Sequence, residues 1–117
     1  METQRKMQFE FLERARSLTK NWSKRESIKL HRIEFIVPFV ATDFSLFVWF
    51  FYRLDLHVSA YATDGISRRL EQYFRLSLKE IGYPLSWQRS VTIDFDSDEN
   101  VQNNFDGNYF YRLRWEL

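Results

Sequence analysis

Two stretches of the chain carry apolar residues at the three- and four-residue spacing of an amphipathic helix. Residues 4–20 place Met7, Phe11, Leu12, Ala15 and Leu18 on one such stripe. A second stripe runs over residues 66–81 and is followed by Gly82 and Pro84, which are typical of a helix end. These patterns predict two helices, with a shorter helix over residues 54–63.

Between the first two helices, the pattern changes to that of extended chain. Residues 32–40 alternate in polarity, and Pro38 inside them indicates an edge strand or a bulge. Residues 45–52 are apolar on both faces, which predicts a strand that is covered on both sides or central in its sheet. The short connection between the two predicts an antiparallel hairpin.

A second antiparallel hairpin is predicted from SVTIDFD (90–96) and YFYRLRW (109–115), which both alternate strictly. In the expected register Val91 faces Trp115, Ile93 faces Leu113, Phe95 faces Tyr111, and Asp94 lies beside Arg112. A register shifted by one residue would bury Arg112, and we reject it because burying an unpaired charge is costly.

The predicted order is therefore helix, strand, strand, helix, strand, strand. This order is typical of a two-layer α+β fold, with helices packed on one face of a four-stranded antiparallel sheet. A chain of 117 residues is long enough for one domain with its own core. We expect a single domain over residues 1–117, in which a basic helix and connection (1–31) lead into an α+β body (32–117).

Aromatic residues are unusually abundant, with 12 Phe, 6 Tyr and 4 Trp in the chain. A buried aromatic side chain removes about 150–250 Å² from water, so a core of this size cannot enclose them all. Some must be exposed, and exposed aromatics can mark a binding surface. The longest apolar run, residues 46–52, is far shorter than the roughly 20 residues of a membrane-spanning helix. We expect a cytoplasmic protein without membrane association.

The motif DFDSDEN raises the question of a calcium loop, because aspartates stand at every second position. Such a loop requires Gly at its sixth position and Glu at its twelfth, where this chain has Glu99 and Phe105. A structural role is favoured instead: Asp96 or Ser97 caps a short helical turn, and Asp98 and Glu99 lie in its first turn. We predict no metal and no cofactor.

Recognisable catalytic motifs are also lacking. The chain has two histidines, three glycines and no cysteine, and contains neither a G-x-S-x-G elbow nor a phosphate-binding Gly-rich loop. We expect a non-enzymatic module that binds another protein. Inhibitors of the bacterial immunity type are one form of such a module, although no motif assigns the chain to them.

The expected partner-binding residues lie in the last hairpin and its turn, where aromatic, basic and acidic side chains are densest. They are Asp96, Asp98, Glu99, Phe105, Tyr109, Phe110, Arg112 and Arg114. Phe110 is the sharpest candidate, because strict alternation places it on the outward face, where an aromatic has no role in folding.

Nucleic-acid binding is the alternative, because charge is unevenly distributed. Residues 1–32 hold 9 Lys and Arg against 4 Asp and Glu, although the net charge of the whole chain is only +1. Basic groups next to aromatics suit binding to a nucleic-acid backbone and bases. The candidate residues are Lys20, Lys24, Arg25, Lys29 and Arg32. The identity of the partner and the oligomeric state stay open.

Overall fold

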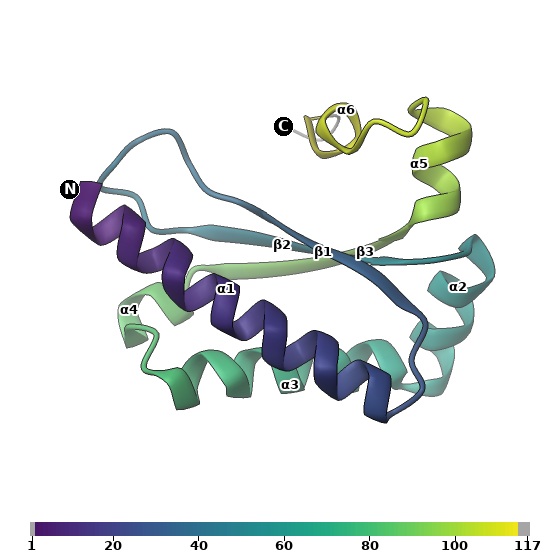
Figure 1. The fold of residues 1–117 in the computed structure, drawn as a ribbon, viewed down its shortest axis with the longest axis horizontal. Helices are drawn as coiled ribbons and strands as arrows, with labels where there is room; N and C mark the ends of the chain where they lie inside the picture. The colour runs from purple at the N-terminus through teal and green to yellow at the C-terminus, as the bar shows by residue number, and fades with distance from the viewer. Residues whose placement is uncertain (1, 115–117) are drawn as a thin grey trace.

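A computed structural model describes residues 2–114 and shows a three-layer arrangement (Figure 1). Two long helices lie below a small sheet, and two short helices lie above one end of it. The elements, in chain order, are α1 (Glu2–Arg25), β1 (Leu30–Ile36), β2 (Leu46–Tyr52), α2 (Asp55–Asp64), α3 (Ile66–Ile81), α4 (Leu85–Gln88), β3 (Val91–Ser97), α5 (Asp98–Asn104) and α6 (Tyr109–Arg114).

The sheet has three strands in the order β1-β2-β3, so the predicted four-stranded antiparallel sheet is wrong. β1 and β2 form the expected antiparallel hairpin, in which Ile33 lies opposite Phe50. β3 runs parallel to β2, with Ile93 beside Val48. The reason is the connection: α2, α3 and α4 carry the chain back to the end of the sheet at which β2 starts, as a parallel pair requires.

The predicted fourth strand is the helix α6, and the hairpin register proposed for it is wrong; Trp115 lies outside the described residues. Asn108 begins this helix, because its side-chain Oδ1 accepts a hydrogen bond from the N–H of Tyr111 at 3.1 Å. Tyr109 and Leu113, four residues apart, then both point at the sheet and pack on its upper face.

β2 is the central strand, and it is buried from both sides. On the lower face, Val48 and Phe50 pack into the main core with residues of α1 and α3. On the upper face, Trp49 and Phe51 form a second cluster with Val101 of α5, which we call the upper cluster. Phe47, on the same upper face, is exposed, so α5 and α6 cover only part of this face.

α1 is longer than expected, because residues 21–25 continue the helix instead of forming a connection. Its buried face also differs from the predicted apolar stripe. Met7 and Leu18 are exposed, whereas the polar side chains of Gln8 and Thr19 are fully buried. The Gln8 side chain is satisfied, since its Nε2 donates to Tyr83 Oη at 3.0 Å, but the Thr19 hydroxyl has no partner within residues 2–114.

The prediction of the helix over residues 66–81 is confirmed at both ends by α3. Gly82 takes a left-handed conformation (φ 90°) after it, and its N–H bonds the carbonyl oxygens of Leu78 and Lys79. None of the described helices is both long and apolar enough to span a bilayer.

The unpartnered Thr19 hydroxyl predicts a stabilising substitution. Thr19→Val keeps the shape of the side chain and removes a buried polar group, so the free energy of unfolding should rise by about 1 kcal/mol. Urea denaturation measures this change. Thr63→Val is the matched control, because the Thr63 hydroxyl is exposed and bonds the Ser59 carbonyl at 3.0 Å. If Thr19→Val lowers the free energy of unfolding by more than the control does, the Thr19 hydroxyl must have a hydrogen-bond partner, and the prediction is contradicted.

Buried tyrosines predict a loss of stability in alkali. Burial raises the pKa of Tyr52 to about 12, against a weaker opposing effect of its 2.7 Å hydrogen bond with Ser67. A tyrosine in the unfolded chain has a pKa of about 10. The folded state therefore keeps a proton that the unfolded state loses, and stability present below pH 10 should fall as the pH rises towards 12. Urea denaturation at several pH values in this range measures the free energy of unfolding, which should fall less steeply with pH in Tyr52→Phe than in the parent. Equal pH dependence in the two proteins would contradict the prediction.

Candidate functional site

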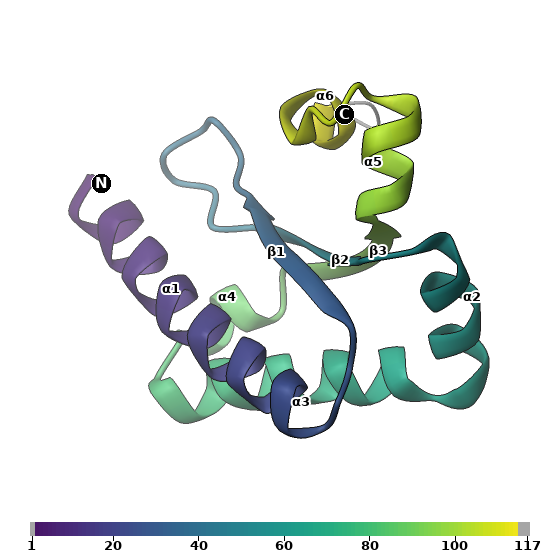
Figure 2. The same ribbon diagram turned by 45° about the vertical axis from the view of Figure 1, so that its right-hand side comes forward.

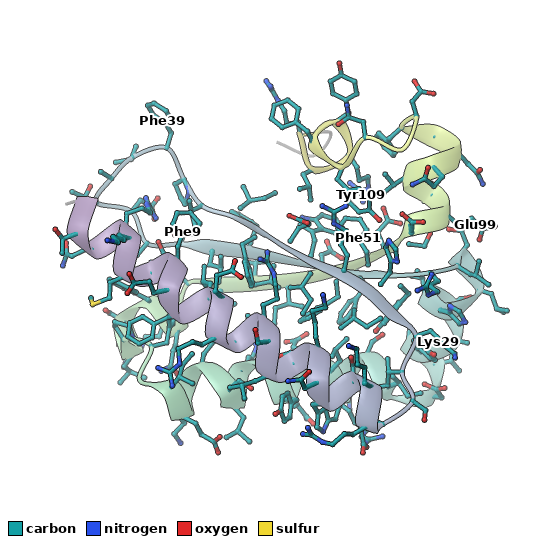
Figure 3. The ribbon with its side chains drawn as sticks, viewed as in Figure 1. Phe9, Lys29, Phe39, Phe51, Glu99 and Tyr109 are labelled. Atoms are coloured by element: carbon teal, nitrogen blue, oxygen red, sulfur yellow. The ribbon has the colours of Figure 1, made fainter. Side chains whose placement is uncertain are left out.

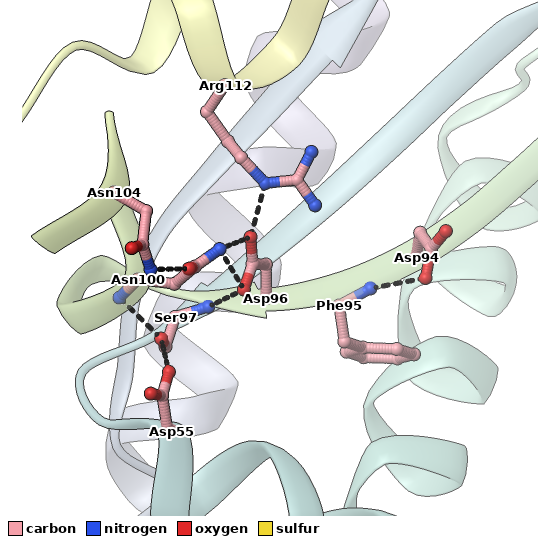
Figure 4. A network of polar contacts seen from close by, with 8 residues as sticks. All are labelled: Asp55, Asp94, Phe95, Asp96, Ser97, Asn100, Asn104 and Arg112. Atoms are coloured by element: carbon pink, nitrogen blue, oxygen red, sulfur yellow. Dashed lines mark hydrogen bonds and ion pairs between the residues drawn. The ribbon is translucent and has the colours of Figure 1, made fainter. Parts of the chain in front are cut away.

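The eight expected partner-binding residues all lie in or beside α5 and α6, but most of them hold these helices in place. Asp96, at the end of β3, forms an ion pair with Arg112 of α6 (Figure 4). The Arg112 guanidinium also lies 4.4 Å from the centre of the Trp49 ring, and the residue is only 7% exposed. The expected pairing of Asp94 with Arg112 is therefore wrong, because Arg112 pairs with Asp96.

The rest of the DFDSDEN motif starts α5. The Asp96 carboxylate accepts hydrogen bonds from Asn100 Nδ2 at 2.9 and 3.2 Å and from the Ser97 N–H at 2.8 Å. Ser97 Oγ accepts the N–H of Asn100 at 2.9 Å, which confirms the prediction of a helix cap here. Its hydroxyl donates to Asp55 of α2. These carboxylates therefore bind groups of the protein itself.

Asp98 and Tyr109 join α5 to α6 and to β1. The Tyr109 hydroxyl donates to Asp98, which also accepts from Gln102 Nε2 at 3.2 Å and lies 3.5 Å from His31 Nε2. Burial alone would raise the pKa of Asp98, but these hydrogen bonds and the charges of His31 and Arg32 outweigh it and lower the pKa. Burial and the Asp98 carboxylate raise the pKa of Tyr109.

Glu99 and Phe105 complete the attachment of α5. Glu99 Oε1 accepts the Asp55 N–H at 2.8 Å, and the Glu99 N–H donates to the Arg53 carbonyl at 3.0 Å. Phe105 packs against the upper cluster and is partly buried. Six of the eight predicted residues thus hold the upper helices on the rest of the protein.

The other two predicted residues, Phe110 and Arg114, lie together on the outer face of α6. Phe110 is 60% exposed, and the Arg114 guanidinium lies 4.9 Å from the centre of its ring. Tyr111, which the strand pattern placed inward, is equally exposed. We call Phe110, Tyr111 and Arg114 the α6 patch; a pocket of about 400 Å³ lies beside it against Phe105 and Asp106.

The loop of residues 37–45 rises on the same upper side of the sheet (Figure 2) and carries another exposed aromatic, Phe39 (Figure 3). Phe39 at its tip is fully exposed. Arg5 of α1 holds the loop, because its Nη2 lies 3.1, 2.9 and 3.0 Å from the carbonyl oxygens of Pro38, Val40 and Asp43. The loop therefore presents Phe39 from an anchored backbone.

The five basic residues predicted for nucleic-acid binding are distributed over α1, the connection after it and β1. Lys24 and Arg25 lie in the last turn of α1, where they suit the negative end of the helix dipole. Lys29 lies in the connection to β1, and its N–H donates to a tyrosine hydroxyl at 3.2 Å. Only Lys20 and Arg32 line a common groove.

The buried ion pair of Asp96 and Arg112 predicts a strong coupling between the two positions. Asp96→Ala should lower the free energy of unfolding by about 3–5 kcal/mol, because it leaves a buried charge without its partner. Adding Arg112→Met should recover part of that loss, with a coupling energy of about 1–3 kcal/mol in a double-mutant cycle by urea unfolding. Arg114→Met is the exposed control and should change stability by less than about 0.5 kcal/mol. If the stability changes of the two single substitutions simply add in the double variant, the proposed ion pair is contradicted.

Within residues 2–114, no three His, Cys, Asp or Glu side chains are placed to share a metal ion. The chain matches no family model, no curated protein and no solved structure.

Proposed function

We propose that this protein is a non-enzymatic module that binds another protein through the upper side of its sheet. The observation that supports this is the position of the exposed aromatic side chains. Phe39, Phe47 and the α6 patch belong to segments on this side and fill neither the main core nor the upper cluster, whereas the exposed Phe9 lies on α1 in the lower layer. An exposed aromatic group of this kind is typical of an interaction surface.

The α6 patch has the composition of an energetically dominant contact. Tyrosine and arginine are enriched among residues whose truncation costs most binding energy, and Phe110 adds apolar area beside them. The patch is also pre-organised, since Arg112 and Tyr109 fix the inner face of α6 on the sheet. Binding therefore loses little conformational entropy. The partner chemistry that fits is an apolar cleft with a carboxylate near its rim to meet Arg114.

Nucleic-acid binding has less support from the arrangement of the basic residues. Arg32, one of the two in the groove, bonds Glu34 at 2.7 Å and lies 4.0 Å from the centre of the Tyr109 ring. If the protein binds nucleic acid instead, a complex with nucleic acid should form whose affinity falls steeply between about 50 and 200 mM salt.

The proposal is tested with a photo-crosslinking amino acid placed at position 110 in the intact protein within its native cells. Position 56 is the matched control, because Leu56 on α2 is 66% exposed, close to the 60% of Phe110. We expect one protein to be crosslinked from position 110 and not from position 56. The crosslink should be lost in Arg114→Glu.

With that partner purified, Phe110→Ala should leave the free energy of unfolding within about 0.5 kcal/mol of the parent. It should weaken binding by about 2 kcal/mol, or roughly thirtyfold in Kd. Equal crosslinking from both positions, or unfolding of Phe110→Ala, would refute the assignment of this surface.

A further inference from the structure

The three-stranded sheet has two outer edges, and only one of them is protected. At the β3 edge, the N–H groups of Phe95 and Ser97 donate to the side chains of Asp94 and Asp96, at 3.0 and 2.8 Å, and not to another strand. The carbonyl oxygen of Val91 accepts from Arg75 Nη2 at 3.1 Å. Side chains thus occupy backbone groups that a further strand would need, which is a known way to block an edge.

The β1 edge lacks this protection by side chains, and its one irregularity is a register shift against β2 between Leu30 and Arg32. Between Leu30 and Ile36, no side chain of the described residues hydrogen-bonds the backbone. A groove of about 350 Å³ runs beside this strand, between it and α1. Its lining comes from two residues of α1 and four consecutive residues of β1: Arg16, Lys20, His31, Arg32, Ile33 and Glu34.

The groove is basic. Three cations and one histidine line it, although Arg16 is paired with Glu13, Arg32 with Glu34 and His31 with Asp98. Lys20 is exposed and forms no ion pair within residues 2–114. Arg16 lies over the Phe35 ring at 4.7 Å, and its Nε is buried without a hydrogen-bond partner in the described chain. Lys20 is therefore available as a cationic donor beside the outer edge of β1.

We propose that an extended, acidic segment of a partner protein adds to the sheet along β1. Its backbone would pair with the free edge, and every second side chain would point down towards Arg16 and Lys20, because side chains alternate across a strand. Acidic residues at alternate positions fit this floor. The site is separate from the α6 patch and does not depend on it.

A second copy of this chain fits the edge less well. Pairing two β1 edges around a twofold axis would bring two basic α1 faces, each with Arg16 and Lys20, against one another. Like charges opposed in this way are unfavourable. Charge complementarity therefore favours an acidic strand over self-association.

The probe is a fluorescein-labelled peptide of four Glu-Val repeats, with a Lys-Val peptide of the same length and a single-stranded thymidine oligonucleotide as comparisons. Anisotropy should show binding of the Glu-Val peptide alone. Lys20→Glu should raise its Kd at least tenfold, equivalent to about 1.4 kcal/mol. Arg14→Glu is the matched control, since Arg14 is an exposed cation of α1 outside the groove, and its Kd should stay within twofold of the parent.

Amide hydrogen exchange distinguishes strand addition from simple charge attraction. Binding of the Glu-Val peptide should slow exchange of outward-facing N–H groups in β1, while those of β3 stay unchanged. The proposal is overturned if the peptide does not bind, if it binds without protecting β1, or if the oligonucleotide binds more tightly in the same groove. None of these results depends on Phe110, so failure here and failure of the α6 patch are separate outcomes.

Discussion

The two-sided burial of β2 determines how the rest of this structure is arranged. Six of its seven residues are buried, on alternating sides of the sheet. A strand that is apolar on both faces needs a layer on each side. α1 and α3 form the lower layer, and the short helices α5 and α6 form the upper one. Because the upper layer is small, Phe47 stays exposed beyond its edge.

The buried pair of Asp96 and Arg112 sets how the upper layer sits on the sheet. Removing a guanidinium from water costs several kcal/mol unless the charge is paired and its donors are used. The observed position of α6 meets this requirement, because it brings Arg112 to Asp96 and onto the Trp49 ring. In that position Phe110 must point outward. The position of the proposed binding surface thus follows from the need to satisfy one buried charge.

Much of the lower half of the molecule could be predicted from apolar periodicity. α3 and the first hairpin have long, unambiguous patterns, and Ser97 stands at the start of α5 as a cap should. The segment YFYRLR could not be assigned this way, because six residues fit a strand of period two and a helix face equally well. Asn108, a good cap residue directly before it, was the available signal for a helix.

The direction of β3 and the roles of the aspartates depend on contacts between distant parts of the chain. A long helical connection after β2 favours a parallel neighbour, whereas the predicted hairpin rested only on the alternation of the last two segments. The partner of Asp96 could not be read from spacing, because Arg112 reaches it only when α6 is helical. Phe110 was correctly expected to be exposed, but for the wrong reason, since its exposure comes from a helix.

The Arg112 side-chain N–H resonance gives the most direct test that this charge positions the upper layer. In NMR spectra of the intact protein, the Arg112 Nε–H signal should be shifted by the Trp49 ring and should exchange slowly with water, because it is buried and bonded to Asp96. The exposed Arg114 provides the reference within the same helix. Exchange of Arg112 as fast as that of Arg114 would show that the pair does not form and that α6 is not held on the sheet.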